Sequence, residues 1–188
     1  MNQLIFHPAS MKENGQIYRF FSSGFIHADI GHLAFNMISL FFFGDMVEDA
    51  FKQIFGNEMG KLFYLLMYGL GLFFALLPTY FEQKNNDYYH SLGASGAVSA
   101  VVFAGIFLFP TSKIGIFILP PIIPGFIFGP IYLGLTVYLA KQNTDNINHS
   151  AHFWGSAFGV FFVWLFATLF SSFEPISAFI YQVTNYFQ

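Results

Sequence analysis

The chain has 188 residues, of which 55% are hydrophobic, 22% aromatic and only 9% charged. A soluble domain carries about 25% charged residues, so this composition excludes an ordinary soluble domain and a disordered chain. The net charge of −3 excludes a basic nucleic-acid-binding protein, and the absence of Cys excludes disulfides and Cys-ligated metal sites. We therefore predict an all-α helix bundle in the lipid bilayer.

The first 28 residues do not resemble a membrane span. They mix polar side chains with Phe and Tyr and are interrupted by Pro8 and Gly15, which predicts an interfacial cap over residues 1–28. A spanning helix needs about 20 mainly apolar residues, and residues 29–172 hold five candidates. These candidates run from about Ile30 to Phe51, Lys61 to Phe81, Ser91 to Phe109, Gly125 to Ala140 and Ser150 to Phe170.

The break at residues 110–124 is apolar and contains four prolines, which forbid a continuous helix. We predict a hairpin or an interfacial segment there. Residues 173–188 form a short aromatic, amphipathic C-terminal tail. Lys and Arg divide three against four between the two membrane faces, so charge does not orient the chain.

Polar side chains inside a membrane span are costly and usually mark function. His32 and Asn36 lie four residues apart near the start of the first span, Ser95 lies near the start of the third, and His152 near the start of the fifth. These three spans run in the same direction, because an even number of crossings separates them. We therefore expect the four side chains to cluster at one depth, one to two turns below the surface.

The members of this cluster suit acyl transfer. Ser95 is a candidate nucleophile with His152 as its base, and Asn36 and His32 are candidate donors to an oxyanion. No acidic residue lies within a span near His152, which favours a dyad over a triad. Small residues would let the helices approach closely enough for these short side chains to meet, above all Gly93, Gly96, Gly155 and Gly159.

Other interpretations remain open for each residue alone. A Ser in a membrane helix commonly bonds its own preceding turn, and an Asn commonly links two helices. His149 and His152 are spaced like two metal ligands, but no Asp, Glu or Cys completes a metal site. A proton or ion relay is a further alternative, although the second and fourth spans offer it no polar path.

Three motifs resemble the rhomboid intramembrane serine protease family of bacterial type, and the similarity covers about Tyr18 to Ala167. His27 to Asn36 is similar to the family's His-x4-His-x3-Asn segment. Gly93-Ala94-Ser95-Gly96 is similar to its Gly-x-Ser-Gly motif, and Ala151 to Gly159 to its Ala-His-x2-Gly-x3-Gly motif.

The resemblance implies that Ser95 is the nucleophile, that His152 is the general base, and that His32, Asn36 and the Ser95 backbone N–H form the oxyanion hole. It implies substrates that are transmembrane proteins, which enter between the spans at 30–51 and 125–140, and no cofactor or metal. It also implies a multi-pass protein of the bacterial inner membrane, with the site and Met1 outside the cytoplasm.

The sequence departs from the family pattern at three places. The family core has six helices, and the first has no counterpart here. Tyr18-Arg19 stands where a Trp-Arg pair is usual, and Ser99 stands where a Tyr stacks on the catalytic His. The alternative is therefore an inactive rhomboid-like protein that binds membrane client proteins.

Overall fold

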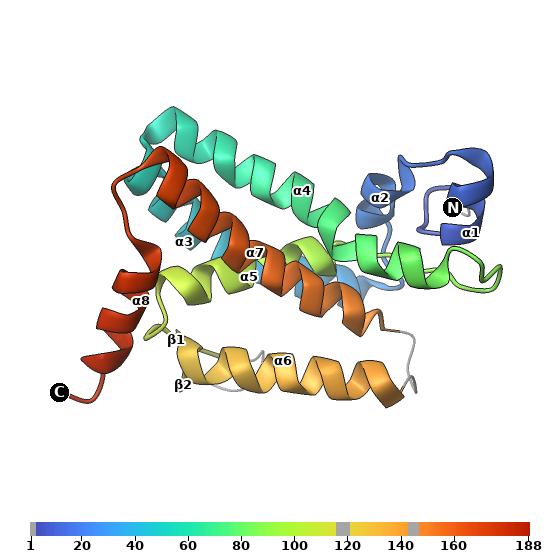
Figure 1. Cartoon of the computed structure of the whole chain (residues 1–188). Coiled ribbons are helices and arrows are strands. Elements are labelled where there is room, and N and C mark those ends of the chain that lie inside the picture. The colour runs from blue at the N-terminus through green and yellow to red at the C-terminus, as the bar shows by residue number, and fades with distance from the viewer. Residues whose placement is uncertain (1–2, 116–120, 143–146) are drawn as a thin grey trace.

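The computed structural model describes residues 3–115, 121–142 and 147–188. It shows a bundle of long helices with short helices at both ends (Figure 1), which confirms the predicted all-α membrane fold. The long helices are α3 (Ile30–Phe55), α4 (Asn57–Gln83), α5 (Ser95–Leu108), α6 (Gly125–Gln142) and α7 (His149–Phe170). Within the described residues, α3, α4 and α7 are long and apolar enough to cross a membrane.

The long helices begin and end at residues with clear physical signals. The Asp29 carboxylate accepts a hydrogen bond of 2.7 Å from the His32 backbone N–H and caps α3. Asn148 caps α7 in the same way, with Oδ1 3.0 Å from the Ala151 backbone nitrogen. Gly56 ends α3 at a φ of 84°, a value that favours glycine, and lets α4 start at the next residue.

The segments outside the long helices are compact. The N-terminal segment forms α1 (Pro8–Asn14), α2 (Arg19–Ser22) and the short 3-10 helix η1 (Ser23–Phe25) beside the end of α4 (Figure 1). Between α5 and α6, β1 (Lys113–Ile114) pairs antiparallel with β2 (Ile123–Pro124), so this break closes as a hairpin. Residues 116–120 of that break lie outside the described residues.

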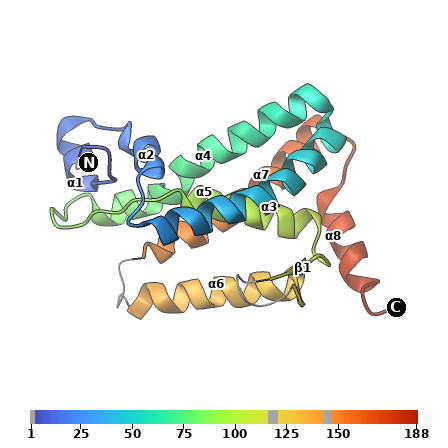
Figure 2. The same cartoon turned by 180° about the vertical axis from the view of Figure 1, so that it is seen from behind.

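Helix α5 lies at the centre of the bundle, packed against α3, α4 and α7 and touching α6 (Figure 2). Its small side chains make this possible, since Ala97, Ala100 and Ala104 are completely buried. Lipid is as apolar as a leucine side chain, so close packing rather than apolar burial holds such helices together. The row of small residues thus places the start of α5 within reach of its neighbours.

Helix α5 begins four residues later than the predicted third span and has only 14 residues. At a rise of about 1.5 Å per residue it is about 21 Å long, shorter than the bilayer core. Two features keep the preceding residues out of the helix: Gly93 has a φ of 110°, and Ser91 pairs with Phe6 as an isolated bridge. Residues 91–94 therefore stay outside the helix, which begins at Ser95.

Candidate active site

The structure brings Ser95 and His152 together from two helices. Ser95 is the first residue of α5, and His152 lies in the first turn of α7. The His152 Nε2 and the Ser95 Oγ are 2.8 Å apart, although 57 positions separate the residues in sequence. Both side chains are only partly buried. Ser95 therefore hydrogen-bonds an imidazole on another helix.

Glycines set the separation of α5 and α7. A Cβ at Gly155 would collide with the carbonyl oxygen of Gly96, and a Cβ at Gly159 would collide with that of Ala100. A Cβ at Gly96 would lie 2.6 Å from the Ala75 Cβ on α4. The two backbones therefore touch, and this close approach allows the short Ser95 side chain to reach His152.

His32 and Asn36 lie on one face of α3, which packs against α5. The His32 ring packs against Gly93, where a Cβ would lie 2.6 Å from His32 Cε1. Asn36 is 1% exposed, and its Nδ2 is a buried donor for which the described residues provide no acceptor. The His32 side chain thus lies against the chain just before Ser95, and Asn36, one turn further along α3, has a buried donor with no acceptor among the described residues.

The N-terminal segment holds the chain just before Ser95. Phe6 and Ser91 exchange backbone hydrogen bonds of 2.9 and 3.0 Å, and the Gly93 N–H donates to the Ser23 carbonyl at 3.0 Å. Arg19, 5% exposed, donates from Nη1 to the carbonyl of Ile5 at 2.8 Å, next to that pair. Sequence reasoning missed this support, because backbone pairing between distant segments leaves little trace in side-chain patterns.

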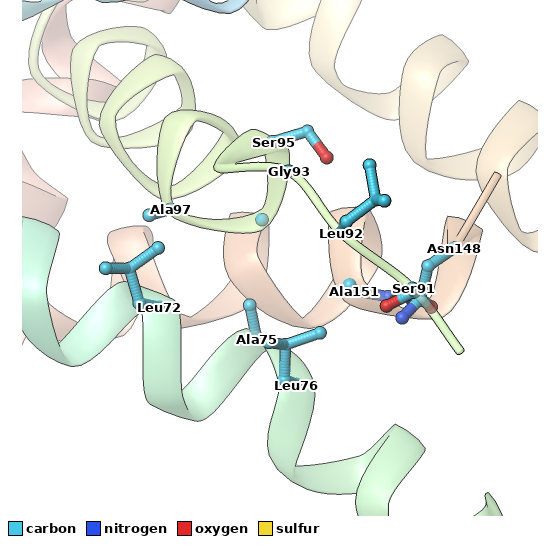
Figure 3. A pocket seen from close by; sticks show the side chains of 11 residues that line it. Leu72, Ala75, Leu76, Ser91, Leu92, Gly93, Ser95, Ala97, Asn148 and Ala151 are labelled. Carbon is cyan, nitrogen blue, oxygen red and sulfur yellow. Dashed lines mark hydrogen bonds between the residues drawn. The ribbon is translucent and has the colours of Figure 1, made fainter. Parts of the chain in front are cut away.

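A cavity of about 20 Å³ lies beside Ser95, between α4 and the starts of α5 and α7 (Figure 3). Its polar lining comes from Ser91, Ser95 and Asn148. The Asn148 Oδ1 accepts hydrogen bonds from Ala151 and from the Thr79 hydroxyl, the latter at 3.3 Å. The Asn148 Nδ2 is buried with no acceptor among the described residues. The cavity has room for about one water molecule.

The remaining histidines near the site form ring contacts. The His27 and His32 ring centroids are 5.0 Å apart, and those of His149 and His152 are 6.0 Å apart. Burial lowers the pKa of His27, and the nearby His32 lowers it further. A hydrogen bond with the Phe25 backbone raises this pKa, but by less than the other two effects lower it. Within the described residues no three His, Cys, Asp or Glu side chains are grouped to hold a metal ion.

Comparison with known proteins supplies the family. The sequence matches the family model described as "Rhomboid domain" over residues 14–169, which is most of the chain. The chain belongs to the rhomboid family. The rhomboid match spans every long helix except the last residue of α7, so the helix bundle is that of an integral, multi-pass membrane protein.

A curated rhomboid relative is similar over much of this chain. It is "RHOMBOID-like protein 12, mitochondrial" of Arabidopsis thaliana, which is 30% identical over 162 residues. The alignment covers 77% of this chain and 45% of the relative, so the chain spans less than half of that protein's length. The similarity supports the rhomboid assignment, and the mitochondrial location is that of the plant protein.

Ser99, which replaces the Tyr of the rhomboid pattern, has an aromatic partner on another helix. Ser99 is 7% exposed on α5, and its side chain lies close to that of Tyr132 of α6. The Tyr132 ring also packs against Phe103, with centroids 5.6 Å apart. A tyrosine is therefore present one turn along α5 from Ser95, but it comes from α6 instead of α5.

Proposed function

We propose that this rhomboid-family protein is an intramembrane serine endopeptidase that hydrolyses peptide bonds in or near the transmembrane helices of membrane-protein substrates. The observation that carries the proposal is the 2.8 Å contact between Ser95 Oγ and His152 Nε2. A serine hydroxyl is a weak nucleophile and needs an adjacent base. Imidazole is the usual base near neutral pH.

The chemistry follows from this pair. As Ser95 Oγ attacks the scissile carbonyl carbon, His152 takes the hydroxyl proton, and a tetrahedral intermediate forms. His152 then gives the proton to the leaving amine, which frees one product and leaves an acyl ester on Ser95. A water molecule, activated by the same imidazole, hydrolyses the ester. The cavity beside Ser95 is a suitable place for that water.

The oxyanion of the intermediate needs hydrogen-bond donors in fixed positions. Three groups are suitable: the backbone N–H of Ser95, which has no acceptor within its own helix at the first position of α5, the Asn36 amide and the His32 ring. The buried Asn36 Nδ2 that lacks an acceptor supports this role, because an unpaired buried donor is costly and rare outside functional sites. We assign these three groups to the oxyanion hole.

Substrate would reach the dyad from the lipid, between α3 and α6. Helix α6 packs on α5 and α7, whereas α3 packs mainly on α4 and α5. Large apolar side chains stay exposed on both helices, such as Phe41 on α3 and Ile131 on α6. We propose that a substrate helix lies along these surfaces, and that the bilayer is the bacterial inner membrane with the site on its outer side.

Cleavage of a transmembrane substrate by the purified protein in detergent or liposomes tests the proposal. Ser95→Ala and His152→Ala should each lower the rate by roughly a thousandfold or more. Ser171→Ala is a matched control, because that hydroxyl bonds the Ala167 carbonyl at 2.8 Å, at the end of α7 opposite to His152. A fluorophosphonate probe should label Ser95 in the wild type and fail to label the His152→Ala protein.

Two outcomes would contradict the protease proposal. Labelling at a serine other than Ser95 would contradict the assignment of Ser95 and His152 as nucleophile and base. A wild-type protein that binds the substrate and leaves it intact would instead identify a rhomboid-like protein that binds membrane clients.

A further inference from the structure

The C-terminal helix α8 (Pro175–Thr184) packs against the end of the bundle that lies away from the dyad (Figure 1). The Phe179 ring on α8 lies 5.7 Å from that of Phe107 on α5. The Gln182 Nε2 donates a hydrogen bond of 3.0 Å to the carbonyl of Leu108, the last residue of α5. That carbonyl has no partner within its own helix, so α8 caps the C-terminus of α5.

The residues that follow α8 continue to the base of α6. The Phe126 ring, at the second position of α6, lies 5.4 Å from the ring of Tyr186 and 6.4 Å from that of Phe187. On the other side, the Phe126 backbone N–H donates to the Pro110 carbonyl at 2.8 Å. The base of α6 is thus held by backbone hydrogen bonds and by two aromatic rings of the tail.

Beyond this base, few residues of α6 are buried, although the Tyr132 ring packs against Phe103 of α5 with centroids 5.6 Å apart. The buried residues of α6 within the described part of the chain are Gly125, Gly129 and Thr136. The two glycines pack on α5, where Ile106 and Phe103 lie close, and the Thr136 hydroxyl bonds its own helix at Leu133. The far end of α6 lies at the end of the bundle where α7 begins (Figures 1 and 2).

We propose that Tyr186 and Phe187 are positioning residues that fix the base of α6 and thereby limit how readily α6 moves away from α3 to admit substrate. This inference rests on the proposed function, in which substrate passes between those helices. Because α6 is long, a small tilt at its base moves its far end by a large distance. A tilt of about 10° displaces the far end of a helix about 27 Å long by about 5 Å. A small loss of contact at Phe126 therefore becomes a large displacement beside the dyad.

The position of α6 can be measured whether or not the protein cleaves a substrate. The chain has no native Cys, so spin labels on Phe35→Cys in α3 and Tyr138→Cys in α6 report one distance; both residues are exposed. In nanodiscs, Tyr186→Ala/Phe187→Ala should broaden and lengthen this distance. The control is Ile180→Ala/Tyr181→Ala on α8, which removes two exposed side chains of similar size and leaves the ring contacts of Tyr186 and Phe187 with Phe126 in place. Equal distributions in the two variants would overturn the proposal.

Kinetics give a second test. If the open fraction of α6 rises about threefold, the apparent KM for a transmembrane substrate falls about threefold, while kcat and the rate of fluorophosphonate labelling at Ser95 stay unchanged. Phe126→Ala should reproduce the change, and combining it with Tyr186→Ala/Phe187→Ala should add little. An unchanged or raised KM would overturn the proposal that Tyr186 and Phe187 fix the base of α6. A wild type that cleaves nothing would overturn the protease proposal. The spin-label distance would still show whether Tyr186 and Phe187 fix the position of α6.

Discussion

At the scale of single residues, neighbours with no chemical role hold the two histidines of the proposed site. Asp29 binds the backbone N–H of His32, and Ser156 donates to the carbonyl of His152 at 2.8 Å. Asn148 caps the turn that carries His152. Mutations at such neighbours should act through position rather than chemistry, so their kinetic effects should be smaller than those at Ser95 or His152.

His27 gives a prediction about pH at this scale. Burial first, and His32 second, lower its pKa in the folded protein, so the unfolded chain binds a proton at a higher pH than the folded chain does. The contribution of neutral His27 to the stability of the fold is therefore complete above the ordinary histidine pKa of about 6.5. It is lost as the pH falls toward the lower pKa that His27 has in the folded protein.

Thermal unfolding in detergent from about pH 8 to about pH 5 measures this effect. The midpoint of the wild type should fall more steeply with acid than that of His27→Gln, which cannot titrate. His90→Gln is the control, because the His90 side chain is exposed. Parallel pH profiles for the wild type and His27→Gln would contradict the assignment.

At the scale of helices, the contact between α5 and α7 determines whether the dyad forms. Two positions on α7 admit only hydrogen, since a Cβ at Gly155 or Gly159 would overlap a backbone carbonyl of α5. The overlap is with backbone, which cannot rotate away as a side chain can. Substitution of either glycine by a larger residue should therefore force α5 and α7 apart.

Gly159→Ala tests this contact two turns away from the dyad. Overpacking of this kind costs about 1–3 kcal/mol, and the helices must separate, so both stability and cleavage rate should fall. Gly69→Ala is the matched control, because a Cβ there meets nothing within 4 Å. That change should be neutral or stabilising by up to about 1 kcal/mol, because alanine favours the helix. Equal unfolding midpoints for the two variants would show that α5 and α7 can separate without cost.

At the scale of the whole molecule, the two ends of the bundle have different tasks. One end holds the N-terminal segment, the chain just before Ser95 and the dyad, and the other holds α8 and the base of α6 (Figure 1). The termini lie at these opposite ends. Charge does not orient the chain in a bilayer, so the proposal that the dyad end lies outside the cytoplasm rests on the rhomboid resemblance alone.

Labelling of single cysteines tests this orientation. In bacteria that express the chain, a membrane-impermeant maleimide should label Glu13→Cys in intact cells and should label Gln188→Cys only after lysis. Both residues are exposed, and no native Cys competes for the reagent. The reverse pattern would place the dyad on the cytoplasmic side.

Much of this architecture could be predicted from local sequence, because a membrane helix depends on a run of apolar residues. The first span was expected from Ile30 and begins there, and Asp29 before it is an ordinary N-cap. The hairpin between α5 and α6 was likewise indicated by its prolines. The rhomboid family follows from three short motifs, since each needs particular residues at fixed spacings.

Tertiary structure decided what depends on distant segments. The late start of α5 comes from the pairing of Ser91 with Phe6, a backbone contact that side-chain patterns do not encode. The contact between Tyr132 and Ser99 and that between the tail rings and Phe126 join helices whose order in sequence does not determine their distance. Composition and spacing determine which segments enter the bilayer, whereas the packing of small residues determines which side chains meet there.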